Sequence, residues 1–455
     1  MKHLVYYFLG FILVMGACKK SDPALPDNVL NFSASTQGLA TADASVDVTI
    51  SLSRTTTVAV PIVIDLQGTG LTYGTEFTTE PAAVNNVLNL TIPAGASSTT
   101  VKVIKKAGIF LNGNESLGFE VKSAGSSIVL GSTNKLKLSF SAITSTGSEL
   151  ILQGGAGGAA AINSVYVDLS ANAQTSVARN SWDLGFYAGA DFRVIINNAN
   201  AASVVAINKT DINTVTAADV TLANLQLGLG TGTLSIIDDV TGDITKTAMP
   251  EVSATDANNK VYVISRAGGS GVMPVAADLY KIRVLRTATG YSLQYAKLNA
   301  TTFNTVAIDK NAANNFNFIS LENGAAVNVE PAKDRWDFVW TYSIYFSGTI
   351  PYAFSDLVFT NHLGGTQVAE VMTSTVAYSA YAESNIATTT FSASRNTISS
   401  NWRATQGTIG AKTDRFYVVK DSGGNVYKLK FVNFTTQDGG NRGYPKIEYA
   451  LVKKG

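Results

Sequence analysis

Cysteine is nearly absent from the sequence, with Cys18 the only one in 455 residues. An exported protein usually keeps its cysteines in pairs as disulfides, so a single cysteine excludes an internal disulfide framework. Cys18 follows Met-Gly-Ala at positions 15–17 and an apolar stretch from Leu4 to Val14, which Lys2 precedes. About 11 apolar residues are too few to span a bilayer, which needs about 20, and the arrangement is typical of a signal peptide.

The position of Cys18 predicts a lipid anchor. Lipoproteins of diderm bacteria begin in this way, and the resemblance implies removal of residues 1–17 and a polar, lipidated tether at 18–27. Each buried methylene contributes about 0.8 kcal/mol, so several acyl chains on one residue anchor a protein stably. We therefore expect an exported protein, anchored to the outer membrane and exposed at the cell surface. The alternative is a membrane helix beside a chance cysteine.

Charge is also scarce, since 15% of the residues are charged and the formal net charge is +1. The usual charged fraction is near 25%. Nucleic-acid binding needs clustered Lys and Arg, so the composition argues against a nucleic-acid partner. The apolar fraction of 45% is enough for packed cores and argues against a disordered chain. No later apolar run approaches membrane-spanning length, and the roughly 437 residues after the signal peptide are long enough for three domains.

Histidine and clustered acids are lacking as well, which argues against an enzyme. Beyond the signal peptide the chain has one histidine, His362, and no G-x-S-x-G motif to present a nucleophilic serine. Metal sites need clustered His, Cys or carboxylates, and the sequence shows no such cluster. The glycine-rich residues 154–158 lack the Lys-Ser/Thr of a phosphate-binding loop. We predict a binding protein with no catalytic residues and no metal site.

Alternation of apolar and polar residues dominates the rest of the chain. Residues 46–52 read Val-Asp-Val-Thr-Ile-Ser-Leu, a pattern that places one face of a strand in a core and the other in water. Similar runs occur at 58–66, 87–92, 99–104, 136–140, 280–284 and 427–431. Helical periodicity is weak, and residues 219–229 are the best candidate for a short helix. The pattern predicts an all-β protein.

Three motifs mark the first predicted domain, residues 28–142. They are Gly-Thr-Glu-Phe at 74–77, Pro-Ala-Gly at 93–95 and Glu-x-x-x-Phe at 115–119. This succession resembles the Calx-β family, which implies an immunoglobulin-like sandwich. Some members bind calcium, which takes about 6 to 8 oxygen ligands. The only acids at the matching turns are Glu76, Glu115 and Glu120, so we expect a spacer sandwich that does not bind calcium.

The rest of the chain repeats itself. Trp182-Asp183 matches Trp336-Asp337 at an offset of 154. Other matches at offsets of 147 to 155 are 166–169 with 318–321, 261–264 with 416–419, 280–284 with 427–431, and 295–296 with 449–450. Five ordered matches predict two tandem copies of one domain, at 148–310 and 311–455. We expect Trp182 and Trp336 to be equivalent buried anchors, and Asp183 and Asp337 to cap turns or bind backbone.

The second copy ends in a distinctive run. It reads Phe-Tyr-Val-Val-Lys-Asp-x-x-Gly-Asn-Val-Tyr-Lys-Leu-Lys-Phe at 416–431, and Ile-Glu-Tyr follows at 447–449. With the Trp-Asp strands, these residues resemble the HmuY-type haem-carrier lipoproteins, more closely in the second copy than in the first. The resemblance implies an all-β fold, present twice. It also implies a surface protein that passes haem to a TonB-dependent receptor in the outer membrane.

Haem is the cofactor that the resemblance implies, but the sequence departs from the family in the iron ligands. Family members hold the iron between two side chains, either a pair of His or a pair of Met, both of which are known axial ligands. The candidates here are His362 with Met372 in the second copy and Met249 with Met273 in the first. Residues 366–371 alternate like a strand of about 20 Å. We therefore expect His362 and Met372 not to converge.

A second class of function remains open, in which the scaffold binds a protein, peptide or glycan instead of haem. Aromatic residues are dense after the second Trp-Asp pair, and such rings stack on sugars and porphyrins alike. They are Trp340, Tyr342, Tyr345, Phe346, Tyr352 and Phe354. Strand alternation places Trp340, Tyr342 and Ile344 on one face, so half of this set is expected in the core.

The anchor is testable by substitution of Cys18. In Cys18→Ala, we expect the protein to leave the membrane fraction or to keep an uncleaved signal peptide, because the acylated side chain is gone. Cell fractionation and the mass of the mature protein measure both outcomes. A Cys18→Ala protein that is processed normally and still fractionates with membranes contradicts the prediction.

Overall fold

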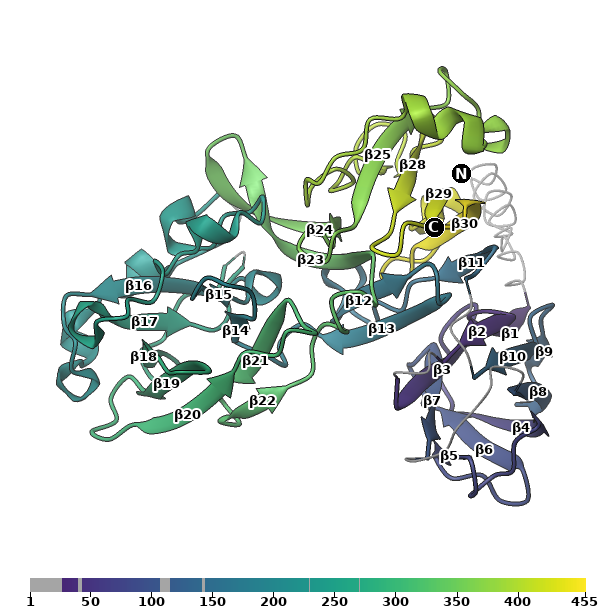
Figure 1. Cartoon of the computed structure of the whole chain (residues 1–455), viewed down its shortest axis with the longest axis horizontal. Coiled ribbons are helices and arrows are strands. Elements are labelled where there is room, and N and C mark those ends of the chain that lie inside the picture. The colour runs from purple at the N-terminus through teal and green to yellow at the C-terminus, as the bar shows by residue number, and fades with distance from the viewer. Residues whose placement is uncertain (1–26, 40–42, 107–114, 141–143, 229, 270) are drawn as a thin grey trace, which may run out of the picture.

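The computed structural model describes residues 27–39, 43–106, 115–140, 144–228, 230–269 and 271–455 (Figure 1). Cys18 and the predicted signal peptide lie outside the described residues. Nearly all regular structure in the described part is β-strand, and the helical segments are short 3-10 turns such as η10 (Glu383–Thr388). The all-β prediction is confirmed. Within the described ranges, no helix has the length and apolar character that crossing a membrane requires.

The helix expected at 219–229 does not form. The segment instead contains two 3-10 turns, η4 (Ala217–Asp219) and η5 (Leu222–Leu225). A Thr residue precedes each turn as its N-cap. Leu225 and Leu227 are both buried, and a spacing of two does not fit one face of an α-helix.

The N-terminal strands form a sandwich of two five-stranded sheets. The sheet orders are β5-β7-β3-β1-β9 and β2-β10-β8-β4-β6. The strands are β1 (Asn28–Phe32), β2 (Thr36–Gly38), β3 (Ser45–Leu52), β4 (Val60–Thr69), β5 (Phe77–Glu80), β6 (Val87–Ile92), β7 (Ser98–Lys105), β8 (Ser116–Ala124), β9 (Ile128–Leu130) and β10 (Lys135–Ser139). Alternate residues of these strands, such as Ile62, Ile64 and Phe119, pack in one core between the sheets.

The remaining strands form two lobes. Lobe 1 is one continuous segment, residues 182–330, with the sheet orders β15-β14-β21-β22 and β16-β17-β18-β19-β20. Its strands are β14 (Leu184–Tyr187), β15 (Val194–Ile196), β16 (Ser203–Ile207), β17 (Val261–Ser265), β18 (Tyr280–Arg286), β19 (Gly290–Lys297), β20 (Asn304–Asp309), β21 (Phe316–Ser320) and β22 (Ala325–Val327). In Figure 1 this lobe is the teal and green part.

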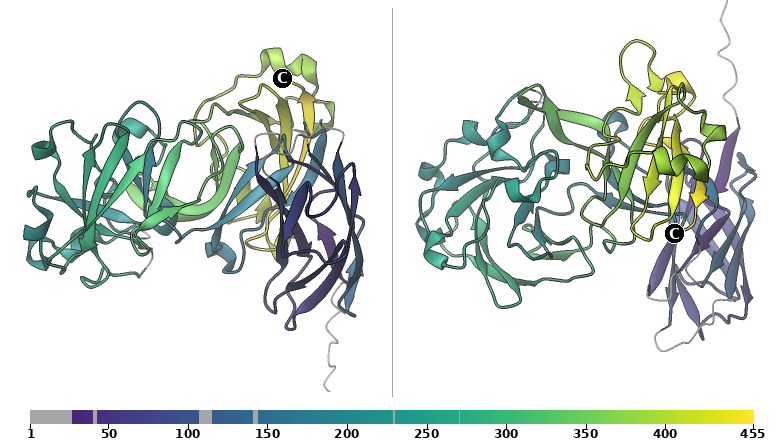
Figure 2. Two further views of the ribbon diagram at one scale, coloured as in Figure 1. Left: turned by 60° about the horizontal axis from the view of Figure 1, so that its bottom comes forward. Right: turned by 45° about the horizontal axis from the view of Figure 1, so that its top comes forward.

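Lobe 2 is built from two segments, residues 144–181 and 331–455. Its sheet orders are β13-β12-β23-β24 and β11-β30-β29-β28-β25, with a small β26-β27 pair. Its strands are β11 (Gly147–Ile151), β12 (Asn163–Asp168), β13 (Ala173–Ala178), β23 (Phe338–Ser347), β24 (Ile350–Thr360), β25 (Gln367–Met372), β26 (Arg403–Ala404), β27 (Gly410–Ala411), β28 (Arg415–Lys420), β29 (Val426–Asn433) and β30 (Lys446–Lys453). Figure 2 shows the two lobes and the sandwich as three neighbouring bodies.

Strands of the two predicted copies are mixed in each lobe. β11 and β12, from the first copy, pair with β30 and β23 of the second, while β21 of the second copy pairs with β14 of the first. Copies at 148–310 and 311–455 are therefore not confirmed as separate domains. The two lobes still follow one plan, since β20 lies beside β19 in lobe 1 as β11 lies beside β30 in lobe 2.

The hairpin β23-β24 reaches from lobe 2 to lobe 1 (Figure 1). Ile344 of β23 packs in one apolar cluster with Leu227 and Ile237 of lobe 1. At the end of the hairpin, the backbone N–H of Gly230 donates to the Pro351 carbonyl at 3.2 Å. The register of the hairpin shifts between Thr341 and Ser343, and such a bulge bends a strand. The bent hairpin fastens the lobes to each other.

The sandwich contacts lobe 2. The Asn172 side chain donates to the Thr36 carbonyl at 2.7 Å, and Arg335 lies 4.0 Å from Asp43. Ala34 of the sandwich belongs to the buried core of lobe 2. The sandwich is thus packed against lobe 2 in addition to being joined to it by the chain.

The mixed pairing predicts which fragments fold. A fragment of residues 182–330 keeps every strand of both lobe 1 sheets, so we expect a soluble protein with a single cooperative thermal transition. A fragment of residues 148–310 lacks β21 and β22, and in it β11 and β12 lose their partners β30 and β23, so we expect aggregation or no transition. Circular dichroism during heating measures both. Independent folding of 148–310 but not of 182–330 contradicts the pairing.

Candidate functional site

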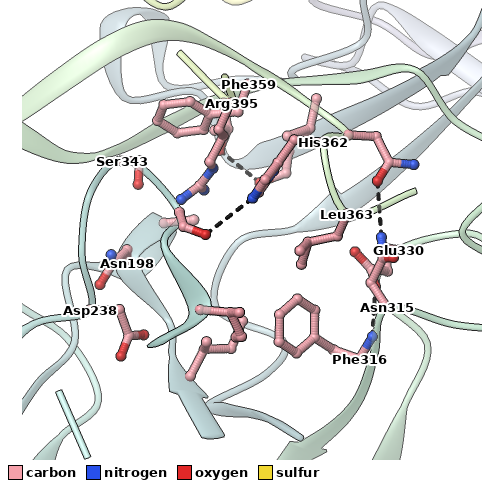
Figure 3. A pocket seen from close by; sticks show the side chains of 18 of the residues that line it. Asn198, Asp238, Asn315, Phe316, Glu330, Ser343, Phe359, His362, Leu363 and Arg395 are labelled. Carbon is pink, nitrogen blue, oxygen red and sulfur yellow. Dashed lines mark hydrogen bonds between the residues drawn. The ribbon is translucent and has the colours of Figure 1, made fainter. Parts of the chain in front are cut away.

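A cavity of about 150 Å3 lies where lobe 1 meets lobe 2 (Figure 3). Both lobes line it with aromatic rings, which are Trp182, Phe316 and Phe318 from lobe 1 and Tyr166, Trp336 and Phe359 from lobe 2. We call it the inter-lobe pocket. Pockets at the junction of two packed units, with apolar walls and few polar groups, are the usual place for small ligands.

Trp182 and Trp336 hold matching places in the walls of the inter-lobe pocket. Trp182 lies just before β14 and Trp336 just before β23, and each side chain is 8% exposed. The Trp182 ring meets Phe318 edge-on with centroids 4.8 Å apart, and the Trp336 ring meets Tyr166 edge-on at 5.1 Å. Each tryptophan therefore packs on a strand of the other predicted copy, β21 for Trp182 and β12 for Trp336, which joins the two walls.

The aspartates beside the tryptophans bind backbone. Asp183 Oδ2 accepts from the Leu321 N–H at 2.7 Å, and Asp337 Oδ2 accepts from the Leu169 N–H at 2.8 Å. Both donors lie just past the end of a strand, β21 in one case and β12 in the other. Each accepted N–H would otherwise be a buried donor without a partner, which costs about 1–3 kcal/mol. We call Trp182-Asp183 and Trp336-Asp337 the two Trp-Asp corners. Each corner holds in place a strand from the other predicted copy.

The two corners differ in charge. In lobe 1, Arg266 lies 2.7 Å from Asp183, and burial raises the pKa of Asp183 against that attraction. In lobe 2 no Lys or Arg of the described residues forms an ion pair with Asp337, and Asp168 lies nearby instead. Burial and the carboxyl of Asp168 raise the pKa of Asp337 well above its usual range. Like charges in a buried site favour protonation of one of them.

Polar side chains interrupt the aromatic walls. His362 Nε2 lies 3.1 Å from the Gly242 carbonyl, and the Arg395 guanidinium covers the Phe359 ring at 4.1 Å. Asp238 accepts from the Ile196 N–H at 2.7 Å. Glu330 accepts from the Phe316 N–H at 2.9 Å. In Figure 3, Arg395 and His362 lie together near Phe359, and Asp238 and Glu330 lie on different sides of the pocket.

Burial changes the protonation of these groups. It raises the pKa of Glu330 to about 8 and that of Asp238 to about 7. Burial, followed by the charge of Arg395, lowers the pKa of His362. At neutral pH, Glu330 is therefore mostly protonated and His362 is neutral. Arg395 is the one Lys or Arg among the described residues that line the pocket.

Three buried polar atoms of the pocket lack a hydrogen-bond partner among the described residues. They are Trp336 Nε1, Asn198 Oδ1 and Thr360 Oγ1. Their residues are 8%, 8% and 2% exposed. A buried polar group without a partner costs about 1–3 kcal/mol, so such groups in a cavity point to a bound molecule or water.

The structure separates the expected haem ligands. His362 lines the inter-lobe pocket. Met372 ends β25 and pairs with Arg415 of β28, and it is not among the described residues that line the pocket. Met249 is 3% exposed and packs in the core of lobe 1, whereas Met273 is 55% exposed after β17. Neither expected pair is brought together at the pocket.

Other expected residues have structural partners. Trp340 and Ile344 are each 1% exposed and belong to cores, as the alternation predicted. Tyr342 lies under Arg179 at 4.6 Å. In the sandwich, Glu76 Oε2 accepts from the Thr72 N–H at 2.6 Å, and Glu120 pairs with two lysines, Lys122 and Lys135. Within the described ranges, no group of three or more His, Cys, Asp or Glu is placed to hold a metal ion.

Several pocket residues have no signal in the sequence. Arg395 lies between η10 and β26, in a segment without a recognisable motif. Glu330 and Asp238 lie in loops that the repeat pattern does not align. A weak signal exists for Asn198 and His362, because each follows an Asn whose side chain binds the carbonyl of the corner tryptophan, Asn197 in one lobe and Asn361 in the other.

Glu330 makes the stability depend on pH. In the unfolded chain its carboxyl loses the proton near an ordinary pKa of 4.5, but in the folded protein it keeps the proton until about 8. The folded state binds more protons between these values, so stability falls as pH rises through them. In Glu330→Gln, whose Oε1 still accepts from Phe316, we expect a smaller loss of stability between pH 5 and pH 8. Urea unfolding measures it. The control is Glu322→Gln in the same lobe, and an unchanged slope in Glu330→Gln contradicts the prediction.

The family model of the HmuY protein matches residues 161–449. Among solved structures, the apo-form Calx CBD1 domain is 10% identical over 26% of this chain and 97% of that chain, with a TM-score of 0.22. A putative carbohydrate binding protein from Bacteroides ovatus is 12% identical over 74% of this chain and 97% of that chain, with a TM-score of 0.19. No curated protein matches the sequence.

The family match is one continuous stretch that covers more than half of the chain. It begins in lobe 2, passes through all of lobe 1 and returns to lobe 2, so it contains both Trp-Asp corners and the inter-lobe pocket. The chain therefore belongs to the HmuY family, whose members are binding proteins of the haem-binding type found outside the cell or at its surface.

Proposed function

We propose that this chain is an exported lipoprotein, anchored to the outer membrane through Cys18, that binds a compact ligand in the inter-lobe pocket. The observation that carries the proposal is the set of unpartnered polar atoms in an aromatic cavity, Trp336 Nε1, Asn198 Oδ1 and Thr360 Oγ1. Asn198 lines the pocket from lobe 1, and Trp336 and Thr360 line it from lobe 2, so the proposed ligand contacts both lobes. The sandwich then acts as a spacer between the anchor and the pocket.

Haem does not fit the residues of the pocket. An iron held on both faces needs two strong ligands, and His362 is the one His or Met, the ligand types that the family uses, among the described lining residues. Its Nε2 already lies 3.1 Å from the Gly242 carbonyl. A cavity of about 150 Å3 holds a molecule the size of benzene, whereas drug-sized ligands occupy roughly 300–1,000 Å3. The proposed ligand is therefore smaller than haem.

Binding through exposed aromatics is less well supported. The hairpin β23-β24 uses much of its apolar surface against lobe 1, where Tyr345, Phe346 and Ala353 join the same cluster as Ile344. Rings that pack inside the molecule are not available to a protein or peptide. A TonB-dependent receptor as partner remains a prediction from the family resemblance.

Two measurements on the mature chain distinguish haem binding from the binding of a compact ligand. We expect a haemin titration to give no Soret shift that depends on His362, because His362 Nε2 already contacts the Gly242 carbonyl and would be the iron's one His or Met ligand. The comparison is between the wild type and His362→Ala. A Soret shift that His362→Ala abolishes contradicts the exclusion of haem.

Tryptophan fluorescence locates compact ligands. The chain has four tryptophans, of which Trp182 and Trp336 line the pocket and Trp340 and Trp402 lie in the core of lobe 2. We expect a panel of single-ring sugars, acids and amides to contain a ligand that changes the emission. The change should disappear in Trp182→Phe/Trp336→Phe and persist in Trp402→Phe. No response to any member of the panel, or one that depends only on Trp402, contradicts the proposed pocket.

A further inference from the structure

We infer that the ligand of the inter-lobe pocket is a small ring-bearing carboxylate, and that the Arg395 guanidinium binds its carboxyl group. The inference rests on the proposed function and names the chemical class of its ligand. It depends on the position of Arg395, on the engagement of the nearby acids and on the shape of the walls.

Arg395 is a partly buried cation without a direct partner among the described residues. Its guanidinium carbon lies over the Phe359 ring, 4.1 Å from the ring centroid. Among the described residues, none forms an ion pair within 4.0 Å of it or accepts a hydrogen bond from it, and its surroundings act on it only through burial and more distant charges. Buried charges are normally paired and hydrogen-bonded because desolvation is costly. A stacked guanidinium with its N–H groups unused matches a planar carboxylate in two parallel hydrogen bonds.

The acids that line the pocket are engaged elsewhere. Asp238 accepts from two backbone N–H groups, one on each oxygen, those of Ile196 at 2.7 Å and Ala248 at 2.9 Å. Asp239 accepts from the Thr241 N–H at 2.8 Å, and Asp243 pairs with Lys246 at 2.9 Å.

Glu330 accepts from the Phe316 N–H at 2.9 Å, and burial raises its pKa to about 8, so at neutral pH it is mostly an uncharged acid. The opposite charge that Arg395 needs is therefore best supplied by a ligand.

The walls favour a ring over an open chain. Trp182, Phe316 and Phe318 line the pocket from lobe 1 and Trp336 lines it from lobe 2. Flat apolar faces of this kind suit a flat or chair-shaped ring. Four acids, Asp238, Asp239, Asp243 and Glu330, line the same cavity. They disfavour a dianion, so a singly charged carboxylate is a better match than a phosphate.

Benzoate and benzamide test the inference on the mature chain, since they share one shape and differ in charge. We expect isothermal titration to give benzoate at least a tenfold lower Kd than benzamide, as expected for charge-assisted pairing with Arg. In Arg395→Met the preference should vanish while benzamide binding is kept. Arg395→Lys should keep only part of it, because an ammonium lacks the planar fork. Arg335→Met, which changes an arginine outside the pocket, is the matched control and should keep the full preference.

The outcomes separate the two proposals. Equal binding of benzoate and benzamide, or a preference that survives Arg395→Met, overturns the carboxylate assignment and leaves the pocket proposal standing. A preference for phenyl phosphate over benzoate also overturns it. If neither probe binds and no ring compound changes the emission of Trp182 and Trp336, both proposals fail. Benzamide binding to Arg395→Met shows that this variant is folded. If the variant unfolds, the test is made with Arg395→Lys instead. Loss of most of the preference for benzoate in Arg395→Lys supports the inference, and full retention of the preference overturns it.

Discussion

Two hydrogen bonds from backbone N–H groups to side-chain carboxyls, Leu321 to Asp183 and Leu169 to Asp337, hold together the part of the molecule on which everything else depends. Each joins the start of a Trp-Asp strand to the end of a strand from the other half of the sequence. Because the neighbouring tryptophans point into the inter-lobe pocket, the same contacts set the distance between its walls. Loss of either carboxylate leaves a buried N–H unsatisfied and loosens a wall at once.

Burial of charge is the second constraint on the pocket. A cavity that collects acids and one arginine in an apolar surround makes each ionisation costly. The chain responds in two ways, by letting Glu330 and Asp238 keep their protons near neutral pH and by leaving the Arg395 guanidinium without a direct partner. The first response limits the negative charge in the pocket. The second leaves the positive charge of Arg395 without an ion-pair partner among the described residues.

Local pattern accounts for much of the fold. The alternation in residues 46–52 and 427–431 predicted strands that the structure contains as β3 and β29, and the matching Trp-Asp pairs predicted corners that are built alike. The partner of each strand was not predictable, since an alternating strand fits either lobe and pairing across about 150 residues has no local signature. Arg395 was missed for a similar reason, because only the folded chain brings its loop against Phe359.

The two lobes follow a common plan, but they place different residues at matching positions around the pocket, so its two sides differ. The loop residue after each corner-binding asparagine is Asn198 on one side and His362 on the other, and both line the cavity. Near them, the Ile196 N–H donates a hydrogen bond to the Asp238 carboxyl, and the Thr360 N–H donates one to the backbone carbonyl of Arg395. Matching positions thus carry an acid in lobe 1 and a base in lobe 2. Two identical halves would accept a ligand equally well in either direction, whereas under the proposed function this polarity would favour one orientation of the ligand.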